Sequence, residues 1–189
     1  MLKRRTALAG SALWLWQGAS ASPEVPALLR AGGCVLVIRH ALAPGTFDPP
    51  GFRLDDCSTQ RNLNDAGRTQ ARRMGAWFER QGLRPARVRS SPWCRCLDTA
   101  RLAFGDAEVW PALGSPVGRT EDTTAEARQV LRQAVHDLTR SKAPFEVWVT
   151  HMFVQQALAG EGTSVGDGLL VQATSPSQVQ VRARWTADG

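Results

Sequence analysis

The sequence predicts an α/β protein, a three-layer α/β/α sandwich built around a mostly parallel sheet. Two short apolar runs rich in β-branched residues, at 33–38 and 145–149, are typical of strands buried on both faces. Segments with apolar residues at helical spacing alternate with such runs, as expected for strand–helix–strand units. Polar residues follow directly after both runs, at the sheet edge where ligands bind in such folds.

The N-terminal segment, residues 1–21, has the features of an export signal. Basic residues precede a short apolar stretch, and Ala-Ser-Ala ending at Ala21 fits a small-x-small cleavage site. A membrane anchor is the alternative, but the stretch from Thr6 to Trp16 is shorter than the roughly 20 residues that a span needs. We therefore expect a cleaved signal, a single domain at 22–189, no stable membrane span, and a periplasmic or secreted protein. The Arg4-Arg5 pair leaves both the general and the twin-arginine export routes open.

The mature chain carries only a modest positive charge. The whole sequence has a formal net charge of +6, of which Lys3, Arg4 and Arg5 in the signal segment contribute three. The remaining +3 is too small to indicate a nucleic-acid partner, and we expect none. Arginine supplies nearly all of the positive charge and binds phosphate oxygens with better geometry than lysine, although a GC-rich genome produces the same bias.

The first apolar run is followed by a long loop and then by a helix. Prolines and glycines recur through residues 43–62, and loops of this length in a compact domain are usually functional or tied down. Asn64 or Asp65 can cap a helix over Ala66 to Gln81, and Gly67 within it indicates close packing.

The remaining elements alternate in type along the chain. Pro92 suits the first turn of a helix because its missing N–H has no partner there in any case. In order, we expect a strand at 87–90, a helix from Pro92 to about 104, a short strand at 108–110, a helix at 123–139, the strand at 145–149, and strands near 168–173 and 178–184.

The residues that follow the strands suggest phosphoryl transfer. Two of the three histidines, His40 and His151, end separate strands, and a third strand leads through Ser90 to Arg95. A neutral imidazole can attack phosphorus and form a phosphohistidine that water then hydrolyses. Cations such as Arg39 and Arg95 hold the phosphate oxygens and disfavour protonation of the nucleophile, so this chemistry requires no metal or cofactor.

Four segments carry further signatures, in the order Val35-Leu-Val-Ile-Arg39-His40-Ala41, Asn62-Leu-Asn-Asp-Ala-Gly-Arg-Thr-Gln-Ala71, Ser90-Ser-Pro-Trp-Cys-Arg-Cys-Leu-Asp-Thr-Ala100 and Trp148-Val-Thr-His151. They resemble the Arg-His-Gly element, the Leu-Thr-x-x-Gly-x-x-Gln-Ala helix, the Ser-Ser-Pro-x-x-Arg-x-x-Gln-Thr-Ala element and the second-histidine strand of the histidine phosphatase superfamily. The resemblance covers most of residues 33–160 and implies a phosphoglycerate-mutase-like fold.

The resemblance implies a role for each matching residue. His40 is the expected nucleophile, Arg39 and Arg95 bind the phosphate, and His151 binds it and steadies the phosphohistidine. Arg61, just before the helix, is expected either to contact substrate or only to form a salt bridge. The short chain resembles the small exported phosphatases more than the mutases, so the expected partner is a sugar phosphate, a nucleotide or a phosphorylated envelope glycan.

The chain departs from the family pattern at several positions. Ala41 replaces the usual glycine, Asp98 replaces a glutamine, and Met152-Phe153 is more apolar than usual. The general acid is not in a recognisable motif, and its candidates are Glu121, Asp122 and Asp167. This gap favours a second hypothesis, a phosphate-binding or sensory module on the same fold that turns over weakly or not at all.

The four cysteines indicate one disulfide in an exported protein. Cys34 lies within an apolar run and is expected to be a buried free thiol, whereas Cys57 is expected to pair with either Cys94 or Cys96. A zinc site and a thiol redox pair at Cys94 and Cys96 are the competing hypotheses. The Cys-x-Cys spacing is short for a zinc site.

Overall fold

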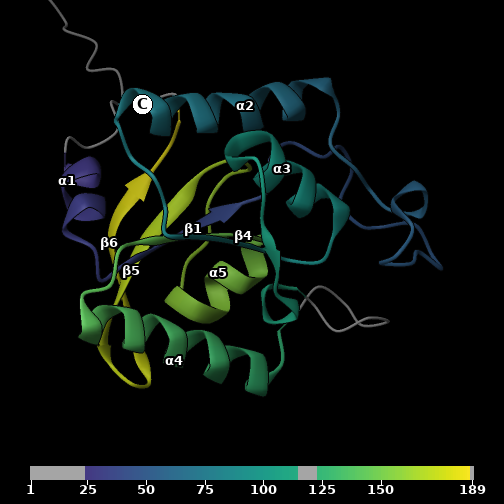
Figure 1. Ribbon diagram of the computed structural model, residues 1–189. Coiled ribbons are helices and arrows are strands. Elements are labelled where there is room, and N and C mark those ends of the chain that lie inside the picture. Colours follow the sequence, from purple (N-terminus) through teal and green to yellow (C-terminus); the bar gives the residue numbers. More distant parts are fainter. Residues whose placement is uncertain (1–23, 115–122, 188–189) are drawn as a thin grey trace, which may run out of the picture.

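A six-stranded sheet in the order β3-β2-β4-β1-β5-β6 forms the middle layer of the protein (Figure 1). The computed structural model describes residues 24–114 and 123–187. The expected signal segment, and the general-acid candidates Glu121 and Asp122, lie outside the described residues. The strands are β1 Val35–Arg39, β2 Arg87–Ser90, β3 Glu108–Val109, β4 Glu146–Thr150, β5 Gly168–Ser175 and β6 Gln178–Trp185.

The centre of the sheet is parallel and fully enclosed. β1 pairs with β4 in parallel from Val35↔Glu146 to Arg39↔Thr150, and β4 pairs in parallel with β2, which pairs with β3. Every residue of β4 is buried, and so are the first four residues of β1, because helices cover both faces. β5 and β6 add an antiparallel hairpin beside β1. The predicted mostly parallel sheet is therefore confirmed.

Helices form the two outer layers (Figure 1). One core cluster joins α1, α2 and α3 to one face of the sheet, and the other joins α4 and α5 to the opposite face. The three-layer sandwich is thereby confirmed. The helices are α1 Glu24–Ala31, α2 Asp65–Arg80, α3 Cys94–Phe104, α4 Ala125–Ser141 and α5 Met152–Ala159, with short 3-10 turns at Cys57–Thr59 and Pro111–Leu113.

Helix α2 fixes the chain that leaves β1. Of the two capping candidates, Asn64 is the N-cap, and its side chain accepts a hydrogen bond from the backbone N–H of Gly67 at 2.8 Å. A Cβ on Gly67 would overlap the backbone carbonyl of Leu42, so only glycine allows this approach. The expected close packing at Gly67 is confirmed, and it holds α2 against the segment just after His40.

Two helices are absent from the sequence-based prediction. α1 and α5 are eight residues each, and α5 has an almost continuous apolar sequence because it packs between α4 and the sheet. Such a helix lacks the polar face that makes helical spacing visible. Pro92 also lies outside α3, because the extended Trp93 is the N-cap and the helix begins at Cys94. The other boundaries shift by one or two residues.

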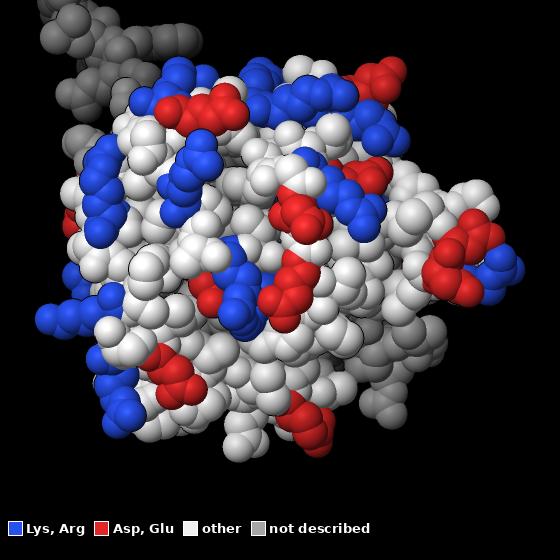
Figure 2. All heavy atoms as spheres, viewed as in Figure 1, with Lys and Arg blue, Asp and Glu red and all other residues white. Residues whose placement is uncertain are grey.

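Charged side chains of both signs are interspersed on the face of the molecule seen in Figure 2. At the β2–β3 edge, Arg87 and Arg89 both approach the carboxylates of Glu108 and Glu146. At the other edge, β6 carries exposed Arg182 and Arg184 and a register shift against β5. Within the described ranges, no helix combines the length and the apolar character that crossing a bilayer requires.

Candidate active site

Adjacent parallel strands bring His40 and His151 together. Each histidine follows its strand directly, and the backbone N–H of His40 donates to the carbonyl oxygen of Thr150 at 2.9 Å. The two ring centroids lie 5.5 Å apart with the rings edge to face. The convergence expected from the strand ends is therefore present in the structure.

The His40 ring is held with one nitrogen available for chemistry. Its Nδ1 lies 2.8 Å from the carbonyl oxygen of Ala41, so Nδ1 carries the proton and Nε2 keeps a lone pair. The residue is only 2% exposed. Burial and the charges of Arg95, Arg61 and Arg39 together lower the pKa of His40 to about 3, against the opposing effect of the Ala41 hydrogen bond. The imidazole is therefore neutral at physiological pH.

His151 is buried and contacted on every side. Its Nε2 lies 2.9 Å from the Ser91 hydroxyl oxygen, and its Nδ1 lies 3.5 Å from Nη2 of Arg95. Phe153 stacks on the ring with centroids 5.0 Å apart, and Trp93 meets it edge-on. Burial, followed by the charge of Arg95, holds the pKa of His151 well below its usual value. The apolar Phe153, a departure from the family pattern, thus orients this imidazole.

Arg95 lies in the first turn of α3, and its side chain is deeply buried. Its guanidinium lies beside His151, and its charge also acts on His40. Its side chain is 1% exposed. Nη1 donates to both carboxylate oxygens of Asp48, at 2.9 and 3.0 Å, while Nη2 faces His151. This guanidinium therefore connects the loop before α2 to the strand ends.

Asp48 is the site residue that sequence reasoning missed. Besides Arg95, its carboxylate accepts hydrogen bonds from the backbone N–H of Arg61 at 2.9 Å and from Nε1 of Trp93 at 3.1 Å. Its side chain is 6% exposed. The only sequence signal was indirect, a carboxylate beside two prolines in a loop expected to be functional. Trp93 is itself buried in the core and also contributes this hydrogen bond.

The other two arginines donate to backbone carbonyl oxygens near the site and act on His40 through their charge. Arg61 donates from Nη1 to the carbonyl oxygen of Ala43 at 2.6 Å, which places its charge beside the segment after His40. Arg39 donates to the carbonyl oxygen of Thr163 at 2.9 Å and contacts the sulfur of Met152 at 3.6 Å. Arg39 also lines a cavity of about 780 Å³ together with Asp167, the one described candidate for the general acid.

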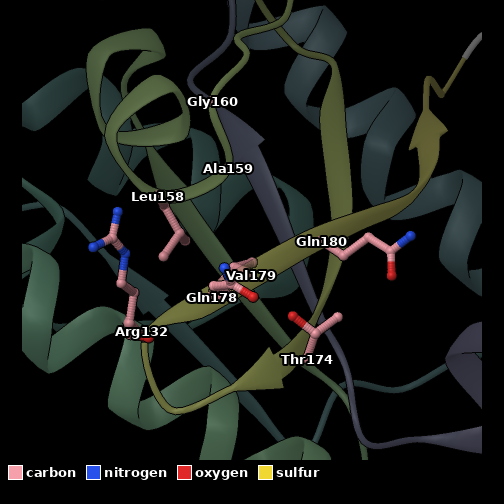
Figure 3. Close-up of a pocket in the computed structure, with 9 residues that line it drawn as sticks. Arg132, Leu158, Ala159, Gly160, Thr174, Gln178, Val179 and Gln180 are labelled. Atoms are coloured by element: carbon pink, nitrogen blue, oxygen red, sulfur yellow. The ribbon is translucent and has the colours of Figure 1, made fainter.

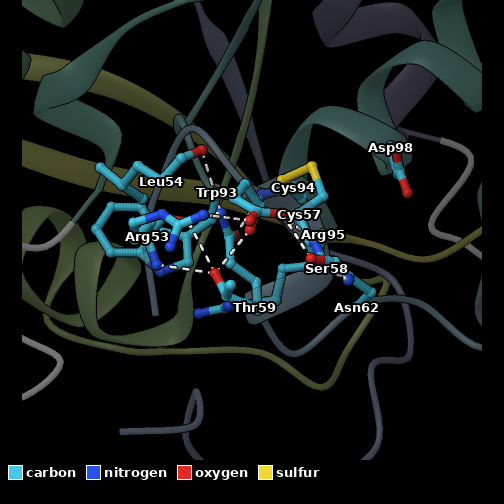
Figure 4. Close-up of a disulfide and its surroundings, with 12 residues drawn as sticks. Arg53, Leu54, Cys57, Ser58, Thr59, Asn62, Trp93, Cys94, Arg95 and Asp98 are labelled. Atoms are coloured by element: carbon cyan, nitrogen blue, oxygen red, sulfur yellow. Dashed lines mark hydrogen bonds and ion pairs between the residues drawn. A yellow bond between two sulfur atoms is a disulfide. The ribbon is translucent and has the colours of Figure 1, made fainter. Parts of the chain in front are cut away.

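A disulfide ties the long loop to α3. Cys57 is bonded to Cys94, 37 residues along the chain, and the side-chain oxygen of Gln60 accepts from the Cys94 backbone N–H at 3.0 Å (Figure 4). The structure thus selects Cys94 over Cys96 as the partner, which contradicts the zinc and Cys94–Cys96 redox hypotheses. Cys34 and Cys96 are buried free thiols, and burial raises the pKa of Cys96 to about 12.

Two other features lie outside this site. Asp98 does not add an isolated negative charge, because it pairs with Arg68 at 3.4 Å. A hollow of about 480 Å³ lies between the end of α5 and the β5–β6 turn, at the opposite end of the parallel strands (Figure 3). Within the described part of the chain, no three His, Cys, Asp or Glu residues gather as metal ligands.

Comparison with known proteins identifies the family and the fold. A family profile, the histidine phosphatase superfamily (branch 1), matches residues 35–147. The protein histidine phosphatase SixA, solved with tungstate, is 20% identical and superposes with a TM-score of 0.59 over 82% of this chain and 97% of SixA.

Two further solved structures share the fold. A putative phosphohistidine phosphatase SixA from Agrobacterium tumefaciens is 19% identical (TM-score 0.55, 81% of this chain and 97% of that one). Phosphoglycerate mutase from Thermus thermophilus is 17% identical (TM-score 0.52, 79% and 98%). No curated protein sequence matches the chain significantly. With the profile spanning more than half of the sequence and the fold shared along nearly all of each neighbour, this chain belongs to the histidine phosphatase superfamily, branch 1.

Proposed function

We propose that the protein is an exported phosphatase that hydrolyses phosphate monoesters through a phosphohistidine on His40. The observation that carries the proposal is the Nδ1 contact of His40 with the Ala41 carbonyl, which leaves a neutral Nε2 lone pair. Loss of water around the ring and three nearby guanidinium charges keep that nitrogen unprotonated. A buried, neutral and oriented imidazole is the form of histidine that can act as a nucleophile.

The reaction proceeds in two displacements. The lone pair of His40 Nε2 attacks phosphorus, the P–O ester bond breaks, and the leaving oxygen takes a proton from solvent water. Water then attacks the phosphorus of the phosphohistidine, the P–N bond breaks, and inorganic phosphate leaves. Arg39, Arg95 and His151 bind the transferring oxygens, where their charge and hydrogen bonds stabilise the transition state. Arg61 contacts the substrate or supplies charge to the site.

The substrate is a phosphorylated small molecule or an envelope glycan, and the site of action is the periplasm or the exterior. The Cys57–Cys94 disulfide supports an oxidising compartment. Since the structural neighbours include a protein histidine phosphatase and a phosphoserine phosphatase, the substrate screen includes a phosphohistidine protein and free phosphoserine beside sugar phosphates and nucleotides. Catalysis by these residues requires no metal, so the activity persists in a chelator.

The test uses the mature protein and p-nitrophenyl phosphate in EDTA. We expect steady hydrolysis by the wild type and none by His40→Ala. His136→Ala, on α4 and outside the site, is the matched control and retains wild-type rates. Quenched turnover with labelled substrate traps an acid-labile, alkali-stable phosphoprotein that His40→Ala does not form. Equal rates for wild type and His40→Ala overturn the assignment of the nucleophile.

A module that binds phosphate without turnover is the second candidate. It is favoured by one observation: the cavity that Asp167, the one described candidate for the general acid, lines together with Arg39 has neither His40 nor His151 in its lining. Tungstate or phosphate binding that depends on Arg95, with no hydrolysis of any phosphoester or phosphoramidate in the screen, decides for this alternative.

A further inference from the structure

We infer that Asp48 is the positioning residue for Arg95, the residue whose carboxylate sets the guanidinium for phosphate binding. Asp48 lies 47 residues before Arg95, in the loop between β1 and α2. The inference deepens the proposed function and rests on it for the role of Arg95. The loop then contributes to catalysis indirectly, because Asp48 acts on the substrate only through the side chain of Arg95.

The carboxylate of Asp48 is fully engaged. Oδ1 accepts from Arg95 Nη1 and from the Arg61 backbone N–H, and Oδ2 accepts from the same Nη1 and from Trp93 Nε1. Each oxygen thus has two donors, within a side chain that is 6% exposed. A buried carboxylate that accepts four hydrogen bonds is held in one orientation. It therefore fixes the positions of the groups that donate to it.

The contact with Arg95 is made through one nitrogen. Both carboxylate oxygens lie within 3.0 Å of Nη1, so the pair does not use the parallel fork that would occupy Nη1 and Nη2 together. Nη2 is left facing Nδ1 of His151 at 3.5 Å. Because the guanidinium is planar, fixing Nη1 fixes the direction of Nη2. Asp48 therefore determines which edge of the Arg95 guanidinium faces His151.

The buried positive charge of Arg95 also requires Asp48 as its partner. The Arg95 side chain is 1% exposed, and a guanidinium buried this deeply is costly unless a countercharge is close. Asp48 supplies one before any phosphate arrives. The pair is in turn held by the loop, because the Cys57–Cys94 disulfide and the Gln60 contact both join that loop to the residue next to Arg95. These attachments of the loop therefore hold the Asp48 carboxylate in a fixed position beside Arg95.

The test is a double-mutant cycle read by anion binding, which needs no turnover. Orthovanadate binding to the mature, oxidised protein is measured by calorimetry for wild type, Asp48→Asn, Arg95→Ala and the double variant. Misplacing a binding group by about 1 Å can cost on the order of 100-fold, so we expect Asp48→Asn to weaken vanadate binding by roughly 10-fold to 100-fold. In the Arg95→Ala background the same change has an effect below about 2-fold, because its target is gone.

Two outcomes overturn the inference. An equal loss in both backgrounds means that Asp48 acts directly on the anion or only through the fold. Tighter vanadate binding by Asp48→Asn means that the carboxylate competes with the anion instead of preparing the site for it. Asp55→Asn is the matched control, because it removes the same charge from the same loop at a side chain that is 87% exposed, and it leaves binding unchanged.

A second variant covers the case in which Asp48→Asn does not fold. Trp93→Phe removes one donor to Oδ2 and leaves every charge in place, and we expect a vanadate loss of about 3-fold to 10-fold that is also confined to proteins with Arg95. A Trp93→Phe protein that binds like wild type overturns the inference. If no variant or wild type hydrolyses phosphoesters but the cycle shows the Arg95-dependent loss, the proposed function fails while the positioning role stands.

Discussion

The strand ends and the loop of residues 43–62 hold their parts of the site in different ways. His40 and His151 are placed by the β1–β4 ladder, in which Arg39 pairs with Thr150 and the backbone continues into the site. Asp48 and Arg61 are placed by side-chain contacts, a disulfide and the N-cap of α2. The backbone ladder is shared by the whole sheet, whereas the loop depends on a few separate attachments.

This difference predicts how the two parts fail. Removing a strand-end residue abolishes chemistry and leaves the sheet intact. Removing one attachment of the loop shifts Arg95 and lowers affinity, because the loop acts on the site through that side chain. Arg95 is the point at which the two regions meet, since Nη1 contacts the loop and Nη2 faces a strand end.

Among changes at the contact between the two regions, the largest effect is expected at Arg95. Lysine offers one ammonium group and cannot contact Asp48 and face His151 with separate nitrogens, so Arg95→Lys is expected to lower kcat/KM by about 100-fold to 1,000-fold. Steady-state kinetics with p-nitrophenyl phosphate measure the loss, and Arg101→Lys, exposed on the same helix, is the control. A loss below about 3-fold would show that loop and strand ends work independently.

Removing the disulfide tests the loop alone. Cys57→Ser with Cys94→Ser frees a loop closed over 37 residues, and the expected loss of unfolding free energy is about 3–4 kcal/mol. Urea unfolding of the oxidised proteins measures it. Reductant should reproduce the loss in wild type and have no effect on the double variant. An unchanged midpoint would mean that the side-chain contacts hold the loop without the covalent bond.

Lowering the pH tests the strand ends. Unfolding restores the ordinary pKa of 6.5 to His40, whereas folded His40 stays neutral down to about pH 3. The unfolded state binds more protons between these values, so stability falls as pH falls through this window, by about 1.4 kcal/mol per pH unit for one histidine. Denaturant unfolding from pH 7 to pH 4 measures the slope. His40→Asn should reduce it, and equal slopes would contradict a neutral buried imidazole.

The smallest expected effect is at the end of the loop. Asn64→Ala removes the side-chain acceptor for the Gly67 N–H and should cost about 1 kcal/mol of unfolding free energy, measured by thermal denaturation. Asn64→Asp keeps an acceptor and should remain near wild type. If Asn64→Ala also changed the affinity for vanadate, the start of α2 would contribute to positioning the loop.

The sequence was informative wherever one local pattern determines the structure. Strands enclosed on both faces leave continuous β-branched runs, so β1 and β4, and with them His40 and His151, could be predicted. Nothing local distinguishes Asp48 from Asp55, because the loop's path over Arg95 depends on contacts distant in sequence. The disulfide partner was likewise undetermined. Helix geometry turns Cys94 toward the loop and Cys96 inward to the Thr150 carbonyl, and neither direction is visible in a Cys-x-Cys pattern.

The edge strand β6 has a consequence for how the protein behaves at high concentration. Among the described residues, no strand pairs with the outer edge of the eight-residue β6. Such an edge is a template on which a second copy can add a strand, the first step of edge-to-edge aggregation. An antiparallel pairing centred on Ala183 would place Arg182 of one copy opposite Arg184 of the other, although Arg184 also pairs with Glu161 of its own chain. The register shift beside these residues bends the edge away from a flat surface. The charges and the bend of β6, the strand farthest from β3, thus oppose aggregation, and this protection should weaken in high salt, which screens the charges.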